Sequence, residues 1–120
     1  MREATGIRHD LFKAIKFEAR AGKKGTVTGV QLGAHFVHRW IFQAAWDHFC
    51  DSIPTASRCK FYSCEALFND AEEWSGYERG IHIAIGRCLM YFCDHAMLPV
   101  ECVNRHATGT KLYRVFDKQP

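Results

Sequence analysis

The spacing of apolar positions predicts helices along most of the chain and strands near its end. Between residues 31 and 50, apolar side chains recur every three or four positions, which is typical of a helix with a wide buried face. We therefore predict the central core helix over residues 31–50. Pro54 should mark its end, because proline cannot continue a helix.

Three further stretches have helical periodicity. Residues 9–21 have an apolar side and a basic side, and Gly22 follows where a helix C-terminal cap favours positive φ. Residues 65–73 follow Ser63, a residue type that caps helix N-termini. Residues 78–96 carry an apolar stripe, and Gly76 allows a sharp turn before them. The stripe consists of Ile81, Ile85, Cys88, Leu89, Phe92 and Ala96.

The last part of the chain is rich in strand-forming residues. Residues 98–105 read as a strand, with Pro99 tolerated only at its start, and residues 111–116 are the natural hairpin partner. Gly109 suits a positive-φ position in the connection. We predict a short extended segment over residues 26–28. The predicted fold class is α+β: a helical core with a C-terminal two-stranded hairpin and an extra N-terminal helix.

Composition favours one domain over residues 1–120, since 48% of the residues are hydrophobic. No run of about 18 apolar residues occurs, so we expect no membrane span. The first residues contain no apolar segment of a secretion signal, which leads us to expect a cytoplasmic protein. In that compartment the six cysteines should be reduced thiols.

The formal net charge is +3, and the charges are unevenly distributed. Residues 1–25 carry a balance of +4 (seven basic, three acidic), residues 26–75 one of −3 (three, six), and residues 76–120 one of +2 (six, four). This distribution fits a protein that presents one positive face. Ordinary scatter of surface charge explains it equally well.

The predicted helix over residues 78–96 has a second face opposite its apolar stripe. Arg79, Ile83 and Arg87 are spaced four apart and therefore share that face. Arginine can bind guanine edges bidentately, and an aliphatic side chain can meet a thymine methyl group. The alternative is a solvated face with Ile83 buried against a neighbour. The hairpin adds a group of cationic residues: Arg105, His106, Lys111 and Arg114.

The order of the predicted elements over residues 31–116 resembles the winged helix-turn-helix superfamily. These elements are a helix, a glycine-containing turn, a longer helix and a basic hairpin. Residues 85–89 look like the middle of a recognition helix, and Leu98-Pro99 looks like the start of the wing. The resemblance implies that Arg79, Ile83 and Arg87 read bases in the major groove. It also implies that the cationic residues of the hairpin contact the DNA backbone. Residues 1–25 would be a basic N-terminal helix or arm.

The resulting functional prediction is a small transcriptional regulator that binds duplex DNA as a dimer. An acidic helix before the turn, with Asp70, Glu72 and Glu73, and the low net charge favour an alternative. That alternative is a small adaptor or inhibitor, anti-CRISPR-like and of phage or mobile-element origin, that binds another protein. The three tryptophans and other aromatic residues would be its interface anchors.

The search for chemistry yields two weak candidates. His35 and His38 would lie three apart on one helix face, but no cysteine or acid follows at matching spacing, so we expect surface or interface histidines. Cys59 and Cys64 are five apart, as are Cys88 and Cys93, and we expect buried thiols; a metal or redox sensor is the third reading.

No recognised catalytic motif occurs, neither a nucleophile elbow nor a phosphate loop nor a zinc-protease helix. The sequence therefore predicts a protein that is not an enzyme, with no catalytic residues, no cofactor and no metal.

Overall fold

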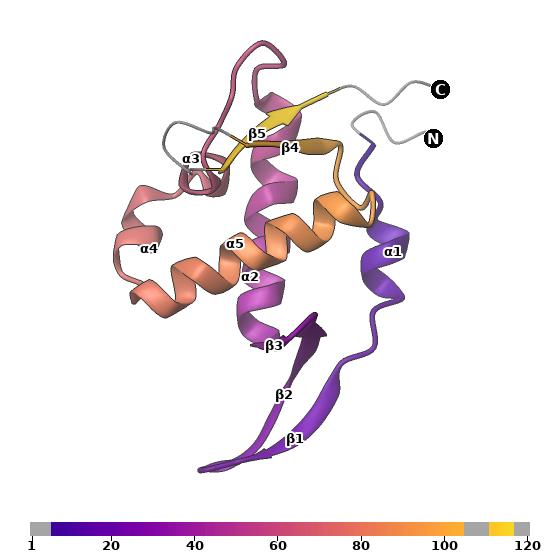
Figure 1. Ribbon diagram of the computed structural model, residues 1–120, viewed down its shortest axis with the longest axis vertical. Helices are drawn as coiled ribbons and strands as arrows, with labels where there is room; N and C mark the ends of the chain where they lie inside the picture. Colours follow the sequence, from indigo (N-terminus) through magenta and orange to yellow (C-terminus); the bar gives the residue numbers. More distant parts are fainter. Residues whose placement is uncertain (1–5, 105–110, 117–120) are drawn as a thin grey trace.

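The computed structural model describes residues 6–104 and 111–116 (Figure 1). Its two longest helices, α2 (Arg39–Ser52) and α5 (Arg79–Asp94), cross and pack against each other at the centre. Two small antiparallel sheets lie on opposite sides of this helix pair. The fold class is therefore α+β, as predicted.

The first sheet precedes α2 and has the order β1-β2-β3. Its strands are β1 (Glu18–Gly22), β2 (Gly25–Leu32) and β3 (His35–His38). The β1–β2 end extends away from the helices and is exposed, whereas Val30, Leu32 and Val37 nearer to α2 are buried. The sheet is thus anchored at one end only.

The second sheet is the hairpin of β4 (Val100–Asn104) and β5 (Lys111–Val115). Tyr62 joins its open edge: the backbone N–H groups of Tyr62 and Tyr113 each donate to the other residue's carbonyl oxygen at 2.7 Å. The segment between α2 and α3 is therefore tied to the hairpin.

Short helices complete the fold: α1 (His9–Lys13), the 3-10 turn η1 (Ile53–Thr55), α3 (Cys64–Phe68) and α4 (Ala71–Ser75). Ser63 caps α3, since its hydroxyl accepts a hydrogen bond from the N–H of Ala66 at 3.1 Å, as predicted. Asp70 caps α4 in the same way, through the N–H of Glu73 at 3.0 Å.

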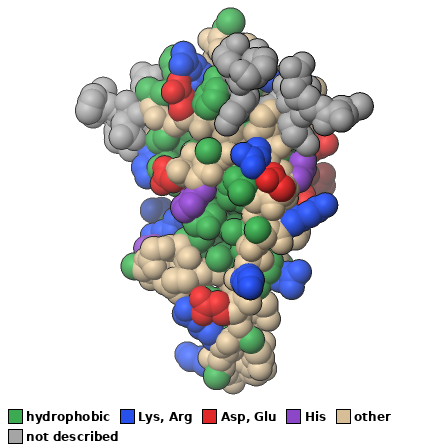
Figure 2. All heavy atoms as spheres, turned by 90° about the vertical axis from the view of Figure 1, so that its right-hand side faces the viewer, with side chains coloured by type: hydrophobic (Ala, Val, Ile, Leu, Met, Phe, Trp, Pro, Cys, Tyr) green, Lys and Arg blue, Asp and Glu red, His purple; other side chains and the backbone are tan. Residues whose placement is uncertain are grey.

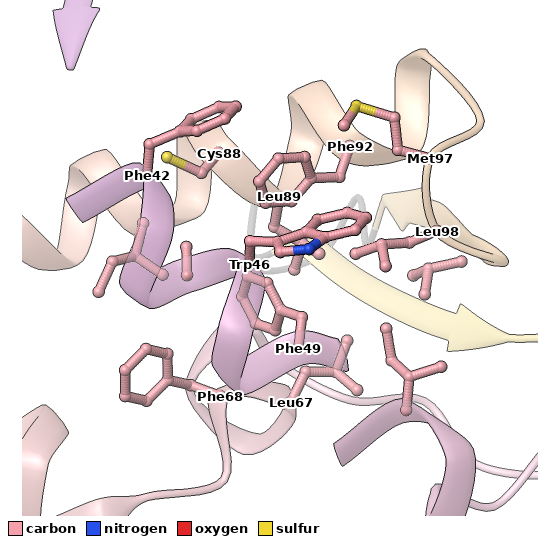
Figure 3. Close-up of a cluster of buried hydrophobic side chains, with 14 of the residues drawn as sticks. Phe42, Trp46, Phe49, Leu67, Phe68, Cys88, Leu89, Phe92, Met97 and Leu98 are labelled. Carbon is pink, nitrogen blue, oxygen red and sulfur yellow. The ribbon is translucent and has the colours of Figure 1, made fainter. Parts of the chain in front are cut away.

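The core lies where α2, α3, α5 and the hairpin meet, and aromatic rings dominate it (Figure 3). Phe42, Phe49 and Phe92 are fully buried, and the Trp46 ring lies 5.0 Å from that of Phe92 between centroids. Such edge-to-face contacts add stabilisation beyond the area that the rings remove from water. This packing holds α5 in a fixed orientation against α2.

The predicted helix over residues 9–21 is wrong beyond residue 13. Helix α1 ends at Lys13, and residues 18–22 pair with β2 as strand β1. Gly22 is consequently no helix cap. It pairs with Gly25, whose φ of 124° lets Lys23 and Lys24 form a tight turn. Residues 26–28 are extended within β2, as predicted.

The predicted core helix over residues 31–50 begins only at Arg39. Residues 31–38 form the end of β2, a turn and β3, because Gly33 adopts φ 60° and allows the chain to reverse. Leu32 and Phe36 are four apart, as in a helix, but Gln31 rather than Leu32 pairs with Phe36 across the strands. The helix continues to Ser52, and Pro54 lies in η1, so the helix ends close to the predicted position.

The predicted helix over residues 65–73 is two helices, separated where Asn69 adopts the left-handed φ of 59°. The prediction of the next helix is confirmed to within two residues at each end. However, Ala96 lies beyond α5, is exposed and has φ 55°, so it does not belong to the stripe.

The predicted hairpin is confirmed as β4 and β5, while its connection with Gly109 lies outside the described residues.

Candidate nucleic-acid interface

Helix α5 has one buried and one exposed face. The buried face is formed by Ile85, Cys88, Leu89 and Phe92, each fully buried, as the predicted stripe requires. On the opposite side Arg79, Ile83 and Arg87 are exposed, and 42% of the surface of Ile83 is accessible. The burial of Ile83 in the alternative interpretation is therefore wrong, whereas the exposure of Arg79 and Arg87 fits a solvated face as well as a base-reading one.

A groove of about 790 Å³ runs along the second half of this exposed face. It is lined by three elements: the turn between β2 and β3 around Gly33, the exposed side of α5, and the first part of β5. Ile83, Arg87 and Lys111 all line it. The fold thus brings residues of the predicted base-reading face together with one residue of the predicted backbone set, whereas Arg79 lies at the start of α5, outside the groove.

The charges that line the groove are mainly positive. Arg87 and Lys111 carry full charges, His35 and His95 add imidazoles, and Asp94 is the one acid among the described lining residues. The His95 ring stacks on Tyr91 at 4.0 Å between centroids. Aromatic rings beside cationic side chains can bind a partner that carries anionic groups.

The two described cations of the hairpin lie on opposite faces of β5. Burial alternates along the strand, with Tyr113 and Val115 buried, so Lys111 shares their side and Arg114 faces the other way. Arg114 forms an ion pair with Glu101, its partner across the strands. Arg105 and His106, the other cationic residues of the predicted set, lie outside the described residues.

Elsewhere charge is mixed. On the face of the molecule shown in Figure 2, acidic and basic side chains are interspersed around a central group of hydrophobic ones. Near the start of α5, Glu73 of α4 has two polar neighbours: its carboxylate accepts a hydrogen bond from the Tyr77 hydroxyl and lies 3.2 Å from His48. Burial, followed by this hydrogen bond, raises the pKa of Tyr77 to about 12.

The helix on which His35 and His38 would share one face is not formed. His35 and His38 lie on strand β3, where residues three apart point to opposite faces, so they do not share one face of a helix. Both are exposed, in agreement with the expectation of surface histidines.

The six cysteines all lie within the described residues, form no disulfide bond there, and differ in exposure. Cys88 is buried as predicted, and Cys64 and Cys93 are half-buried. Cys59 is exposed, so the prediction of a buried thiol is wrong there. Burial raises the pKa of the Cys64, Cys88 and Cys93 thiols to about 12. Because the thiolate is the reactive form, these three have the character of packing residues.

The sequence did not predict two features of the structure: one wall of the groove and a separate cluster of possible metal ligands. The β2–β3 turn was assigned to a helix, although Gly33 is unfavourable in a helix interior and could have indicated a turn. The cluster of His48 with Asp70 and Glu73 joins residues up to 25 positions apart in the sequence, so no local pattern indicates it.

Comparison with known proteins finds no matching family model, no matching curated protein and no matching solved structure. In the described part of the chain, none of the helices is both long enough and apolar enough to cross a membrane.

Proposed function

We propose that the protein is a small transcriptional regulator that binds duplex DNA with the exposed face of α5. The observation that carries this proposal is the face of Arg79, Ile83 and Arg87, held outward by the buried stripe on the other side of the helix. Arginine side chains would bind guanine edges in the major groove, and Ile83 would contact thymine methyl groups. The proposed role is binding without catalysis.

The order of elements supports a winged helix-turn-helix as the finer description of the fold. Helix α2, the pair α3 and α4, helix α5 and the β4–β5 hairpin follow one another as the resemblance implies. In this description α5 is the recognition helix and the hairpin is the wing. Two copies would bind as a dimer to a two-fold symmetric site, in the cytoplasm, where such a regulator meets its DNA.

The positions of the charged residues around α5 indicate how the duplex would lie on the protein. Glu72 and Glu78 are exposed near the start of α5 and would repel phosphates there. Lys111 lines the groove on the hairpin side of α5 and offers a phosphate contact. We therefore expect the DNA backbone to run along the hairpin side of the helix, with Arg87 toward the bases.

Binding of the purified protein to a random duplex pool between about 50 and 200 mM salt tests the proposal, because each phosphate contact adds to the salt dependence. We expect Lys111→Ala to weaken binding to all sequences similarly and to reduce the salt slope by about 1. Lys13→Ala removes the same charge from α1, outside the groove, and should leave the slope unchanged. Absence of binding at the lowest salt would refute the proposal.

A second candidate function, binding of another protein as an adaptor or inhibitor, is favoured by exposed aromatic residues near the hairpin. Phe61 and Phe116 are 55% and 37% exposed, and they adjoin Tyr62 and Val115 of the second sheet. Large exposed rings of this kind are common interface anchors. If this candidate is correct, nuclease-treated cell extract will still yield a partner for the wild type, and Phe61→Ser will lose it. Partners that disappear after nuclease treatment would count against it.

A further inference from the structure

Three side chains from two helices meet beside the turn that leads to α5. His48 comes from the middle of α2, Asp70 is the N-cap of α4, and Glu73 lies in its first turn. One ligand atom of each side chain lies within 4.8 Å of the corresponding atoms of the other two. The His48 Nε2 and a Glu73 carboxylate oxygen are 3.2 Å apart.

We propose that His48, Asp70 and Glu73 bind one divalent transition-metal ion, with Zn²⁺ as the best fit. Two ligands of a tetrahedral Zn²⁺ ion, each about 2.0–2.1 Å from it, lie roughly 3.4 Å from each other, close to the His48–Glu73 separation. One imidazole nitrogen and two carboxylate oxygens are accepted zinc ligands, and three protein ligands leave a fourth position for water. The imidazole favours Zn²⁺ over Mg²⁺ and Ca²⁺, which prefer oxygen ligands only.

Each ligand is already positioned by a contact of its own. The His48 ring is stacked on Phe68, with centroids 3.9 Å apart and an angle of 24° between the planes. One oxygen of Asp70 accepts the N–H of Glu73, which fixes the carboxylate and leaves its second oxygen available. These contacts reduce the ordering cost of binding, since the side chains need little rearrangement.

The surroundings of the cluster supply an outer shell. The Tyr77 hydroxyl donates a hydrogen bond to Glu73, as residues behind a ligating carboxylate commonly do. Three arginines, Arg8, Arg20 and Arg114, form ion pairs with acids outside this cluster: Asp10, Glu18 and Glu101. A divalent cation would supply positive charge between the carboxylates of Asp70 and Glu73, which lie close together with His48.

Calorimetric titration of the full, metal-free chain with Zn²⁺ tests the proposal, together with Co²⁺ absorption spectra as a probe of the ligands. We expect one equivalent to bind with a rise in the melting temperature, because the ion binds the folded state. Asp70→Asn keeps the helix cap but weakens the ligand, and it should lower the affinity by more than about tenfold. Tyr77→Phe should lower it by about tenfold, as the loss of an outer-shell partner does.

Glu72→Gln is the matched control, since it removes the same charge from the same turn of α4 without touching the three ligands. Its affinity should equal that of the wild type. The proposal is overturned if Zn²⁺ does not bind, if Asp70→Asn and Glu72→Gln bind equally well, or if Co²⁺ shows the intense thiolate charge-transfer band of a cysteine site.

Discussion

Gly29→Ala should destabilise the protein by at least about 3 kcal/mol, the upper end of the cost of overpacking a close contact. A methyl group at this position would lie 2.1 Å from the backbone carbonyl oxygen of Val37 and 2.9 Å from the Phe36 ring. The carbonyl belongs to strand β3, which is paired with β2, so relief requires the two strands to separate. The change therefore tests the first sheet directly.

Urea denaturation of the two proteins measures this effect. Gly86→Ala is the matched control, because its added methyl group meets nothing within 4 Å and lies in the middle of α5. It should stabilise the protein by up to about 1 kcal/mol, the helix preference of alanine over glycine. If Gly29→Ala were as stable as the wild type, the close pairing of β2 with β3 at this position would be wrong.

Replacing Arg79 and Arg87 together by alanine should weaken DNA binding at least about 30-fold. Each bidentate arginine–guanine contact contributes about 1–3 kcal/mol of discrimination, and the two residues lie two helical turns apart. Both side chains are exposed, so unfolding free energies should change by no more than about 0.5 kcal/mol. Titration of a selected duplex with each variant at fixed salt measures the loss.

The control for this pair is Arg20→Ala, which removes an exposed arginine of β1 that is paired with Glu18 and lies outside the groove. It should change the affinity less than about threefold, as loss of a distant charge does through screened electrostatics. In addition, Arg87→Ala should accept several base pairs where the wild type selects guanine. Equal losses for Arg20→Ala and Arg87→Ala would mean that binding follows net charge and that α5 does not read bases.

The sequence predicted the second half of the fold better than the first, for a physical reason. The stripe from Ile85 to Phe92 follows one period over several turns, and only a helix buries those side chains together. Between residues 9 and 50, by contrast, the spacing of the apolar residues is compatible with a helix and also with a β-hairpin whose turn lies at Gly33. Tertiary contacts decide there: Leu32 and Val37 are buried on the sheet, whereas Trp40, an apolar residue within the predicted core helix, is 49% exposed.

The candidate site, like the fold, could be predicted from the sequence only in part. The exposure of Arg79, Ile83 and Arg87 could be predicted, because a helix that buries one face must expose the other. The groove depends on long-range packing that brings the β2–β3 turn and Lys111 to α5, and no spacing along the chain encodes it. The same holds for His48, which meets Glu73 only after α4 has packed near α2.

The central claim is that the exposed face of α5 contacts duplex DNA, and an NMR titration of the isotopically labelled protein with a selected duplex tests it most directly. We expect the largest changes in backbone amide signals at residues 79–91 of α5 and at Lys111, with little change in the β1–β2 turn. The claim would be contradicted if no signal moved at about 50 mM salt, where phosphate contacts are strong. Changes confined to the region of Phe61 and Phe116 would contradict it equally.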